Sequence, residues 1–338
     1  MSGNAVSRPR RPTMVDVARQ AEVSLKTVSR VVNGESGVSP ETARRVNRAI
    51  TRLGFQRNVA ASGLRRGTSA SIGLVVEDLA NPFYSLLAAA VEHEARAEGH
   101  LMVSASAEGD PSREAELVTA LLARQVDGLV VVPATRGEAA ERHQTWGTPV
   151  VYVDRPGSGA GADSVLSDNV GGIRSAVEHL AARGHRHIGF LGDDPAHWTA
   201  GQRELAFRAT HEALGLAGEP RVAMGPHTVE SVEGVLLGWA SDPSAVTALV
   251  TGNNRVTVAV LRAMRRQSLP LSLVGYDDFE LADLLEPAVT VVHQDPTAMG
   301  RQAAHQLFAR IRGEAGPPRT VTLPTRLLVR SSGDKGAS

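Results

Sequence analysis

The sequence predicts a small all-α head at the N-terminus, followed by a larger α/β body with two doubly wound lobes. Three observations predict this division: helical patterns fill residues 13–55, short apolar runs alternate with helical patterns from Ser71 onward, and basic residues concentrate at the N-terminus. The 338 residues are 42% hydrophobic and 21% charged. That composition is globular, with room for two or three cores of about 100 to 150 residues each.

The net charge of zero is divided unevenly along the chain. Residues 1–67 contain thirteen Arg and Lys against four Asp and Glu, so this part has nine positive charges in excess and the remainder has nine negative charges in excess. A cationic head indicates a polyanionic partner, and composition alone leaves DNA, RNA and a membrane surface open. The Arg- and Pro-rich residues 1–12 predict a disordered basic tail.

The sequence contains no cysteine, which excludes disulfides, thiolate zinc sites and cysteine nucleophiles. Residues 1–12 have no apolar signal region, and no later apolar run approaches the roughly 18 residues of a membrane span. We therefore expect a cytoplasmic protein without a membrane partner.

Two short helices joined by a tight turn are predicted at the start of the head. Thr13 followed by Asp16 is typical of a helix N-cap with its reciprocal acid. The apolar face of this first helix consists of Val15, Val17, Ala18 and Ala21. Ser24 can cap the second helix over residues 25–32, whose inward side chains are Val28, Val31 and Val32.

A third helix begins at Ser39 and Pro40, the cap and the first helical position, and ends at Gly54. Its core stripe consists of Ala43, Val46, Ile50 and Leu53. The three helices predict a helix-turn-helix domain over residues 13–57. A three-helix bundle with a solvated basic face is the alternative. DNA binding is favoured because the second helix exposes polar residues at its N-terminal end and the basic excess can contact phosphates.

The stretch from Thr13 to Phe55 resembles the DNA-binding head of the lactose-repressor (LacI/GalR) family of bacterial transcription regulators. In that family the next segment, residues 58–68 here, folds into a hinge helix when it meets the minor groove. The resemblance assigns base contacts to Leu25, Lys26 and Arg30. It assigns phosphate contacts to Ser24, Thr27, Ser29 and Asn33, and hinge contacts to Asn58, Ala61 and Leu64. Packing within a disordered linker is the alternative role for Leu64.

Three residues depart from the family pattern in the head and hinge, and one of them, Arg57, replaces the usual proline before Asn58. Glu22 stands where the family usually has glycine, in a turn that often needs a positive φ, at a cost of about 1 kcal/mol. Gly63 lies inside the expected hinge helix and weakens it by roughly 0.5 to 1 kcal/mol. We therefore expect a hinge that depends on DNA more than in a typical member.

Uninterrupted apolar runs in the body predict strands that are buried on both faces and linked by helical crossovers. These runs are residues 72–76, 101–104, 129–132, 150–153, 188–191, 248–250 and 273–274. The pattern restarts near Val170, which predicts two lobes separated by a cleft. Ligands of such bodies bind at the carboxyl ends of the strands.

The body, residues 69–330, resembles the bilobed, periplasmic-binding-protein-like effector domain of the same family. The matching segments are residues 78–84, 127–129, 184–189, 274–278 and 323–327. The resemblance places effector contacts at Phe83, Tyr84, Asp154, Trp198, Arg203, Asn253 and Asp277. An arginine and an aspartate between aromatic walls suit a polyhydroxylated ring, so a sugar is the expected small-molecule effector.

Several alternatives stay open at this site. Trp198 could be a core tryptophan, Phe83 and Tyr84 could pack the lobe, and Asp154 could cap a strand end. The effector could be a purine or another metabolite, acting as a co-repressor.

An enzyme is the first competing function, but the sequence has no Gly-x-Ser-x-Gly elbow, phosphate-binding Gly-Lys-Ser/Thr loop or His-Glu-x-x-His motif. An exported solute-binding protein is the second, and the basic head argues against it. Residues 331–338 are polar without leucine heptads and predict a disordered tail, so a homodimer is expected. The sequence therefore predicts a DNA-binding repressor without cofactor or metal, which binds a palindromic duplex operator.

Overall fold

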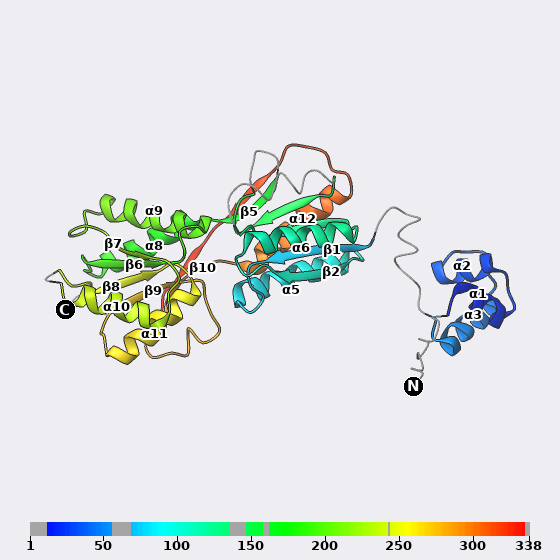
Figure 1. Cartoon of the computed structure of the whole chain (residues 1–338), viewed down its shortest axis with the longest axis horizontal. Coiled ribbons are helices and arrows are strands. Elements are labelled where there is room, and N and C mark those ends of the chain that lie inside the picture. The colour runs from blue at the N-terminus through cyan, green and yellow to red at the C-terminus, as the bar shows by residue number, and fades with distance from the viewer. Residues whose placement is uncertain (1–11, 56–68, 135–146, 158–161, 243, 335–338) are drawn as a thin grey trace, which may run out of the picture. The chain divides into compact units, whose positions relative to one another are not determined.

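The computed structural model describes residues 12–55, 69–134, 147–157, 162–242 and 244–334 of the chain (Figure 1). The chain divides into two compact units, Met1–Ser69 and Ala70–Ser338. These units contain the predicted head and the predicted body. Within the described residues, no helix has the length and apolar character that crossing a membrane requires.

The head contains three helices, α1 (Met14–Ala21), α2 (Leu25–Asn33) and α3 (Pro40–Leu53). The predicted caps are confirmed: Thr13 and Asp16 form a capping box, while the side chains of Ser24 and Ser39 accept hydrogen bonds at the starts of α2 and α3. The core of the head consists of Val17, Ala18, Ala21, Val28, Val46 and Ala49. Val15 was expected in this core but is 51% exposed. Two residues along a helix correspond to about 200°, which turns Val15 away from Val17.

Glu22 takes the left-handed conformation that the turn after α1 requires, with φ of 51°. Arg45 of α3 supports this turn from the side. Its Nη2 atom donates to the carbonyl of Ala21 at 2.8 Å and lies 3.8 Å from the Glu22 carboxylate. The hydrogen bond to an exposed helix end offsets part of the backbone strain at Glu22.

The first lobe of the body contains a six-stranded parallel sheet in the order β11-β5-β4-β3-β1-β2. Its strands are β1 (Ser71–Val76), β2 (Leu101–Ser106), β3 (Gly128–Val131), β4 (Val150–Val153), β5 (Asp163–Ser167) and β11 (Thr320–Leu323). Its helices are α5 (Pro82–Ala97), α6 (Pro111–Ala123) and α12 (Pro296–Ile311). Gly300 lets α12 approach α5 closely, because a Cβ there would lie 2.5 Å from the Leu87 carbonyl oxygen.

The second lobe repeats this design with the strand order β12-β10-β9-β8-β6-β7, in which only β12 is antiparallel to its neighbour. Its strands are β6 (Ile188–Gly192), β7 (Arg221–Met224), β8 (Ala248–Thr251), β9 (Ser272–Tyr276), β10 (Thr290–His293) and β12 (Arg326–Leu328). Its helices are α8 (Asn169–Ala182), α9 (Trp198–Ala213), α10 (Val229–Ala240) and α11 (Asn254–Gln267).

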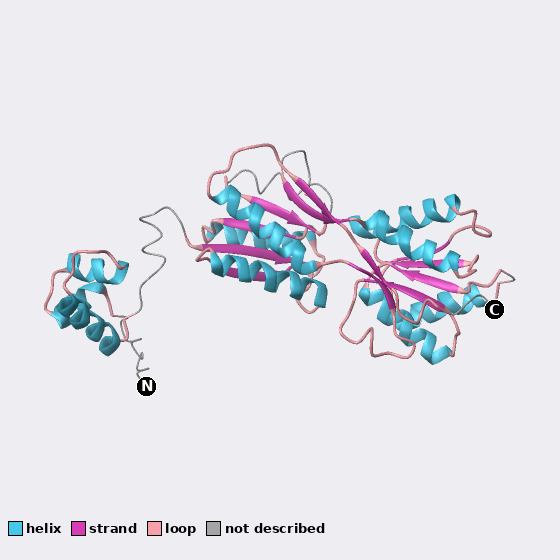
Figure 2. Cartoon of the chain, turned by 180° about the vertical axis from the view of Figure 1, so that it is seen from behind, coloured by secondary structure: helices cyan, strands magenta, loops and turns pink. Residues whose placement is uncertain are grey.

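Three crossings join the two lobes, after β5, after β10 and after β11 (Figure 2). The second lobe begins at Asn169, beside the predicted restart at Val170. The sequence patterns did not predict that α12 and β11 return to the first lobe. As a result, each lobe is built from segments far apart in the chain, and the crossings form a hinge region beside the cleft.

All seven predicted strands are present, but one prediction about burial is wrong. Strand β2 lies at the edge of its sheet, and Leu101 is 70% exposed. An edge strand lacks a neighbour on one side, so it is not covered as the central strands are. Residues 331–334, placed by the sequence in a disordered tail, are another difference. Ser332 is buried and its Oγ donates to the carbonyl of Leu273 at 2.6 Å, while Asp334 pairs with Arg183 at 2.7 Å.

Candidate functional sites

Helix α2 presents the predicted base-contacting side chains to solvent. Leu25 is 49% exposed, Lys26 is exposed, and the side chain of Arg30 is 42% exposed. An apolar side chain left half in water gains little burial free energy from folding. The exposure of Leu25 is therefore compatible with a contact to a partner surface, and the head core does not need it.

The predicted phosphate-contacting residues on α2 also take part in local hydrogen bonds. Ser24 Oγ accepts from the Thr27 backbone N–H at 3.1 Å, and the two hydroxyls lie 2.8 Å apart. Asn33 Nδ2 donates to Ser29 Oγ at 3.3 Å. A hydroxyl that accepts one hydrogen bond keeps its O–H for another acceptor. Helix capping and phosphate contact can therefore occur together at Ser24.

One acidic residue lies beside this basic surface. Glu35 accepts a hydrogen bond from Asn33 at 3.1 Å, and its carboxylate lies 4.0 Å from Nε of Arg30. The predicted base contact of Arg30 would replace this acidic neighbour. The remaining predicted DNA contacts, Asn58, Ala61 and Leu64, lie outside the described residues, as does Gly63.

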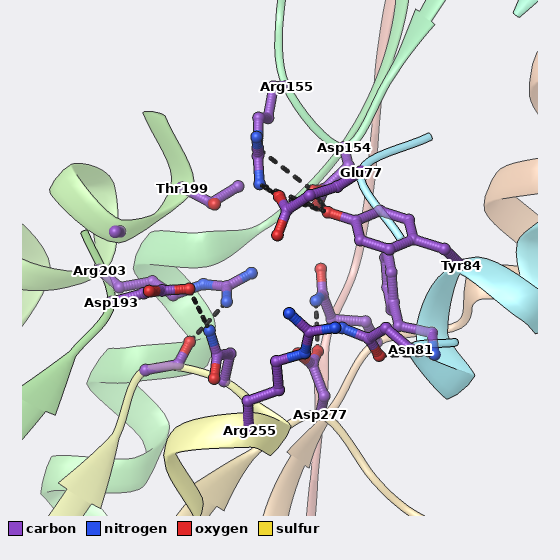
Figure 3. Close-up of a pocket in the computed structure, with 15 residues that line it drawn as sticks. Glu77, Asn81, Tyr84, Asp154, Arg155, Asp193, Thr199, Arg203, Arg255 and Asp277 are labelled. Carbon is purple, nitrogen blue, oxygen red and sulfur yellow. Dashed lines mark hydrogen bonds and ion pairs between the residues drawn. The ribbon is translucent and has the colours of Figure 1, made fainter. Parts of the chain in front are cut away.

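A cleft in the body gathers side chains from the carboxyl ends of strands in both lobes (Figure 3). It is bordered by residues after β1, β4, β6, β8, β9 and β10 and by the first turns of α5, α9 and α11. Of the predicted effector contacts, the cleft is lined by Phe83, Tyr84, Asp154, Arg203, Asn253 and Asp277. Trp198 begins α9 but is not part of the lining.

The first lobe contributes a buried cluster built around Asp154. The Tyr84 hydroxyl donates to Asp154 Oδ2 at 3.3 Å, and Arg155 Nε lies 3.7 Å from the same oxygen. Burial raises the pKa of Asp154 above its ordinary value, although Arg155 and Arg203 oppose this rise. Asp154 also has a φ of 68°, a left-handed conformation at the end of β4. Backbone strain of this kind concentrates at functional sites.

Glu77, which follows β1, completes the cluster by pairing with Arg155. The other end of the Arg155 guanidinium is fixed by the Pro133 carbonyl, which accepts from Nη1 at 3.0 Å. Burial opposes ionisation of Glu77, but the positive charge of Arg155, assisted by His197 and Arg255, places the pKa of Glu77 below its ordinary value. Glu77 is therefore a carboxylate at neutral pH and offsets the charge of Arg155.

The second lobe contributes Arg203, which is 4% exposed. Its Nε donates to Asn169 Oδ1 at 2.7 Å and its Nη1 donates to the Gly252 carbonyl at 2.6 Å. The guanidinium carbon lies 3.8 Å from the centre of the Tyr276 ring, a cation–π contact. These contacts fix the orientation of Arg203 toward the cleft.

Asp277 occupies the position in the second lobe that Asp154 occupies in the first. It follows β9, is 7% exposed and has a φ of 64°. Gln294 donates to Asp277 and accepts from Ser167, which lies at the end of β5 in the first lobe. Burial raises the pKa of Asp277, against the opposing effects of Arg203 and Gln294. The two aspartates thus present acceptor oxygens to the cleft from opposite lobes.

The side-chain atoms of Asn253 are already occupied. Its Oδ1 accepts from the Val256 backbone N–H at 2.8 Å as the N-cap of α11, and its Nδ2 donates to Asp193 at 2.7 Å. Asn253 therefore contributes to the cleft mainly as a structural residue. Its amide orients the carboxylate of Asp193, which is the hydrogen-bond acceptor at this position.

Two polar atoms of the cleft, Asp154 Oδ1 and Arg155 Nε, have no hydrogen-bond partner among the described residues. Both residues are at least nine-tenths buried, at 3% and 5% exposed. A buried polar group without a partner costs about 1–3 kcal/mol. Asp154 Oδ1 can accept a hydrogen bond and the Nε–H of Arg155 can donate one. A hydroxylated ring can satisfy both groups, because each hydroxyl both donates and accepts.

The free space within the cleft is about 40 Å³. This is space for a few water molecules and is less than a sugar ring occupies. The two lobes are tied at its edge, where Asn254 Nδ2 donates to Asn81 Oδ1 at 2.8 Å and Arg255 pairs with Asp78. We expect ligand entry to require separation of these contacts.

Seven polar lining residues were not predicted from the sequence: Glu77, Asn81, Arg155, Asp193, Thr199, Arg255 and Gln294. A signal was available for three of them. Glu77, Asp193 and Gln294 each follow directly on an apolar strand, as Asp154 and Asp277 do. Because parallel strands end at one edge of a sheet, every polar residue at such an end was a candidate.

Two sequence families match the chain. The pattern of bacterial regulatory proteins, lacI family, matches residues 13–58, and the periplasmic binding protein-like domain matches residues 177–333. The HTH-type transcriptional regulator CelR of Thermobifida fusca is 36% identical over 346 aligned residues, which cover 97% of this chain and 100% of CelR. The ribose operon repressor of Haemophilus influenzae is 31% identical, over 95% of this chain and 98% of that repressor.

Two solved structures of similar proteins also cover most of the chain. The lac repressor dimer bound to operator and the anti-inducer ONPF has a TM-score of 0.86 with 26% identity, over 96% of this chain and 99% of that one. A complex of the transcriptional regulator CelR with cellobiose has a TM-score of 0.71 with 30% identity, over 95% of this chain and 100% of that one.

Proposed function

The chain belongs to the LacI family of bacterial regulatory proteins, and from this premise we propose that it is a transcriptional repressor that binds a palindromic operator as a homodimer and responds to a sugar. The relatives are transcriptional regulators, so the function is regulatory and not enzymatic. The proposal joins the exposed cationic helix of the head to the polar cleft of the body in one regulatory cycle.

The exposed surface of α2 supports DNA as the partner of the head. Arg30 and Lys26 can each donate to guanine O6 and N7 in the major groove, and Leu25 can contact a thymine methyl. One head makes few phosphate contacts, too few for a long-lived specific complex at cellular salt. A second head on the same dimer binds at high effective concentration. The operator is then a palindrome of about two helical turns or less.

Exposed apolar side chains on the body support association of two copies. Large aliphatic residues stand in solvent on α5, on the edge strand β2 and in the segment after β9: Leu86, Leu101, Val103, Leu281, Leu284 and Leu285. Exposed apolar side chains that form a contiguous patch commonly mark protein–protein interfaces. A homodimer would remove them from water.

The observation that carries the sugar proposal is the Oδ1 atom of Asp154, which has no hydrogen-bond partner among the described residues and lies in a cleft that also contains Arg203 and Asp277. Relatives named for cellobiose and ribose give independent support. The purine alternative receives less support, because the aromatic residues of the lining, Phe83 and Tyr84, pack edge to face against one another and present no parallel pair for a flat base.

Ligand and operator affinities are coupled in this proposal, and the coupling is reciprocal. A sugar that separates or tightens the lobes changes the spacing of the paired heads. Whatever factor the sugar applies to operator affinity, the operator applies to sugar affinity.

A test uses the purified chain and duplexes from beside its own gene. We expect retention of one such duplex with an affinity that falls steeply with salt. We also expect a thermal shift with one neutral sugar, since a ligand at one hundred times its dissociation constant stabilises by about 2.7 kcal/mol. Failure to bind any duplex contradicts the operator proposal, and failure of every sugar contradicts the effector proposal.

A further inference from the structure

The three arginines that line the cleft are not equivalent. Arg203 is held by neutral partners, the Asn169 amide, the Gly252 carbonyl and the Tyr276 ring. Arg255 is half exposed and paired with Asp78 at the rim. Arg155 is buried and faces two carboxylates of the lining: it pairs with Glu77 through Nη2, and its Nε lies 3.7 Å from Asp154 Oδ2 (Figure 3).

The Arg155 guanidinium has little left to offer an anion. Nη2 is bonded to Glu77 and to the Tyr84 hydroxyl, and Nη1 is bonded to the Pro133 carbonyl. Only Nε lacks a hydrogen-bond partner among the described residues, and it lies 3.7 Å from Asp154 Oδ2. Recognition of a carboxylate or phosphate by arginine commonly uses two parallel N–H groups. Glu77 already occupies the side that a ligand anion would need, and one remaining N–H suits a hydroxyl or ring oxygen.

The charges around Glu77 reinforce this arrangement. Arg155, His197 and Arg255 face Glu77, while the cleft also contains the carboxyl groups of Asp154, Asp193 and Asp277. A ligand anion entering beside these groups would meet acidic neighbours at short range in a site that excludes most water. Such repulsion is far stronger there than in bulk water.

We propose that Glu77 is a specificity-determining residue that, by neutralising Arg155, makes the cleft select uncharged sugars over acidic ones. This inference rests on the proposed sugar-effector function and narrows its ligand class. When Glu77 loses its charge, Arg155 keeps only the longer contact of Nε with Asp154, its Nη2 becomes available, and the preference should shift toward sugars that carry a carboxylate or a phosphate.

The test measures the affinity ratio within matched sugar pairs by calorimetry on the full chain. The pairs are cellobiose with cellobionate, glucose with glucuronate, and ribose with ribose 5-phosphate. For the pair that binds, we expect the wild type to prefer the neutral member by roughly tenfold or more and Glu77→Gln to move that ratio toward the anion by a similar factor. Glu77→Asp should restore part of the preference, because it restores the charge.

Two further variants separate this role from a general effect on folding. The double variant Glu77→Gln with Arg155→Gln has the net charge of the wild type and should lose the gain for the anion. Glu108→Gln, which removes an exposed carboxylate outside the lining, should leave the ratio unchanged. Because the readout is a ratio within one protein, a uniform loss of affinity or stability does not imitate it.

The outcomes are distinguishable. A wild type that binds the acidic member as well as the neutral one, or a ratio that Glu77→Gln leaves unchanged, overturns the inference while sugar binding itself stands. A gain for the anion that persists in the double variant overturns the role of Arg155. Failure of every sugar in the panel to bind contradicts the proposed effector class, and the inference with it.

Discussion

Leu25 and Lys26 of the head stand in solvent on α2, whereas Asp154 and Arg203 of the body are more than nine-tenths buried. The predicted base-contacting side chains lie outside the core of the head, so they contribute little to folding. In the body, the proposed effector-binding side chains are bonded to the chain itself, as Arg203 is to Asn169. Recognition and stability are therefore separable in the head and combined in the body.

The largest expected effect is a loss of sugar affinity when an acidic residue of the cleft in the body is neutralised. Asp277→Asn keeps a residue that tolerates the φ of 64° but removes the charge of an acceptor inside the cleft. We expect sugar affinity to fall roughly 100-fold, about 2.7 kcal/mol, because hydrogen bonds to charged groups are the stronger ones. Calorimetry measures the loss, and operator affinity without sugar should be unchanged. Asp283→Ala, an exposed aspartate in the segment after β9, is the matched control. An unaltered sugar titration of Asp277→Asn would remove this residue from the site.

The head half is tested by Arg30→Ala against Ser29→Ala. Loss of a base contact by Arg30 should cost about 1–3 kcal/mol and relax the preference at one base pair, whereas loss of a phosphate contact by Ser29 should weaken all sequences alike. The free energy of unfolding of both variants should lie within a few tenths of a kcal/mol of the wild-type value, because neither side chain belongs to the head core. Fluorescence anisotropy with operator variants measures the difference. Arg48→Ala on α3 removes the same charge as a control, and equal effects of Arg30→Ala and Arg48→Ala on every operator would defeat the assignment.

A third prediction concerns stability of the body at acidic pH. Asp163 accepts from Arg310 at 2.7 and 3.0 Å and from the Arg319 backbone N–H at 2.7 Å. Burial acts to raise the pKa of Asp163, but the bonds from Arg310 and Arg319 outweigh it and lower this pKa below its ordinary value of 3.8. Since the folded pKa lies below the unfolded one, this stabilisation is complete above 3.8 and is lost as pH falls toward the folded pKa.

The measurement for Asp163 is urea unfolding between about pH 5 and about pH 3. The free energy of unfolding of the wild type should fall over this range by about 1 kcal/mol more than that of Asp163→Asn, which cannot take up the proton. Glu108→Gln should follow the wild type. Identical pH profiles for the wild type and Asp163→Asn would show that the Asp163 pair does not stabilise the body.

The smallest expected effect lies at the margin of the head surface. Glu35 lies beside Arg30 and Asn33. The side chains of Glu35 and Arg30 are about half exposed, at 54% and 42%. Exposed pairs of this kind contribute little. Glu35→Gln should therefore raise the affinity for all duplexes only about two- to threefold at low salt, and the gain should vanish at high salt. An increase confined to one operator sequence would instead make Glu35 part of base recognition.

Features that depend on local sequence could be predicted, whereas contacts between distant segments could not. The caps Thr13, Ser24 and Ser39 are local features that need no knowledge of the fold, and all three predictions are confirmed. Asp154 and Asp277 could be proposed because they end apolar strands. Glu77 and Arg155 pair only because β1 and β4 belong to the same sheet. The local sequence around either residue does not predict this pairing.

Strands that are not continuous apolar runs escaped prediction for a related reason. Strand β11 alternates between exposed and half-buried residues, and β7 is half-buried throughout. Both lie at sheet edges, where the burial pattern that predicts a strand is absent. Trp198 shows the opposite error, because its nearness to Arg203 in the sequence did not bring its side chain into the lining.

A sugar bound in the body should alter the affinity of the head for DNA, and a reciprocal titration measures this coupling. Operator affinity of the full chain is measured with and without saturating sugar, and sugar affinity with and without operator. We predict the same factor in both directions, of about five- to 150-fold. If both ligands bind but neither changes the affinity for the other, the proposed coupling between sugar and operator is contradicted.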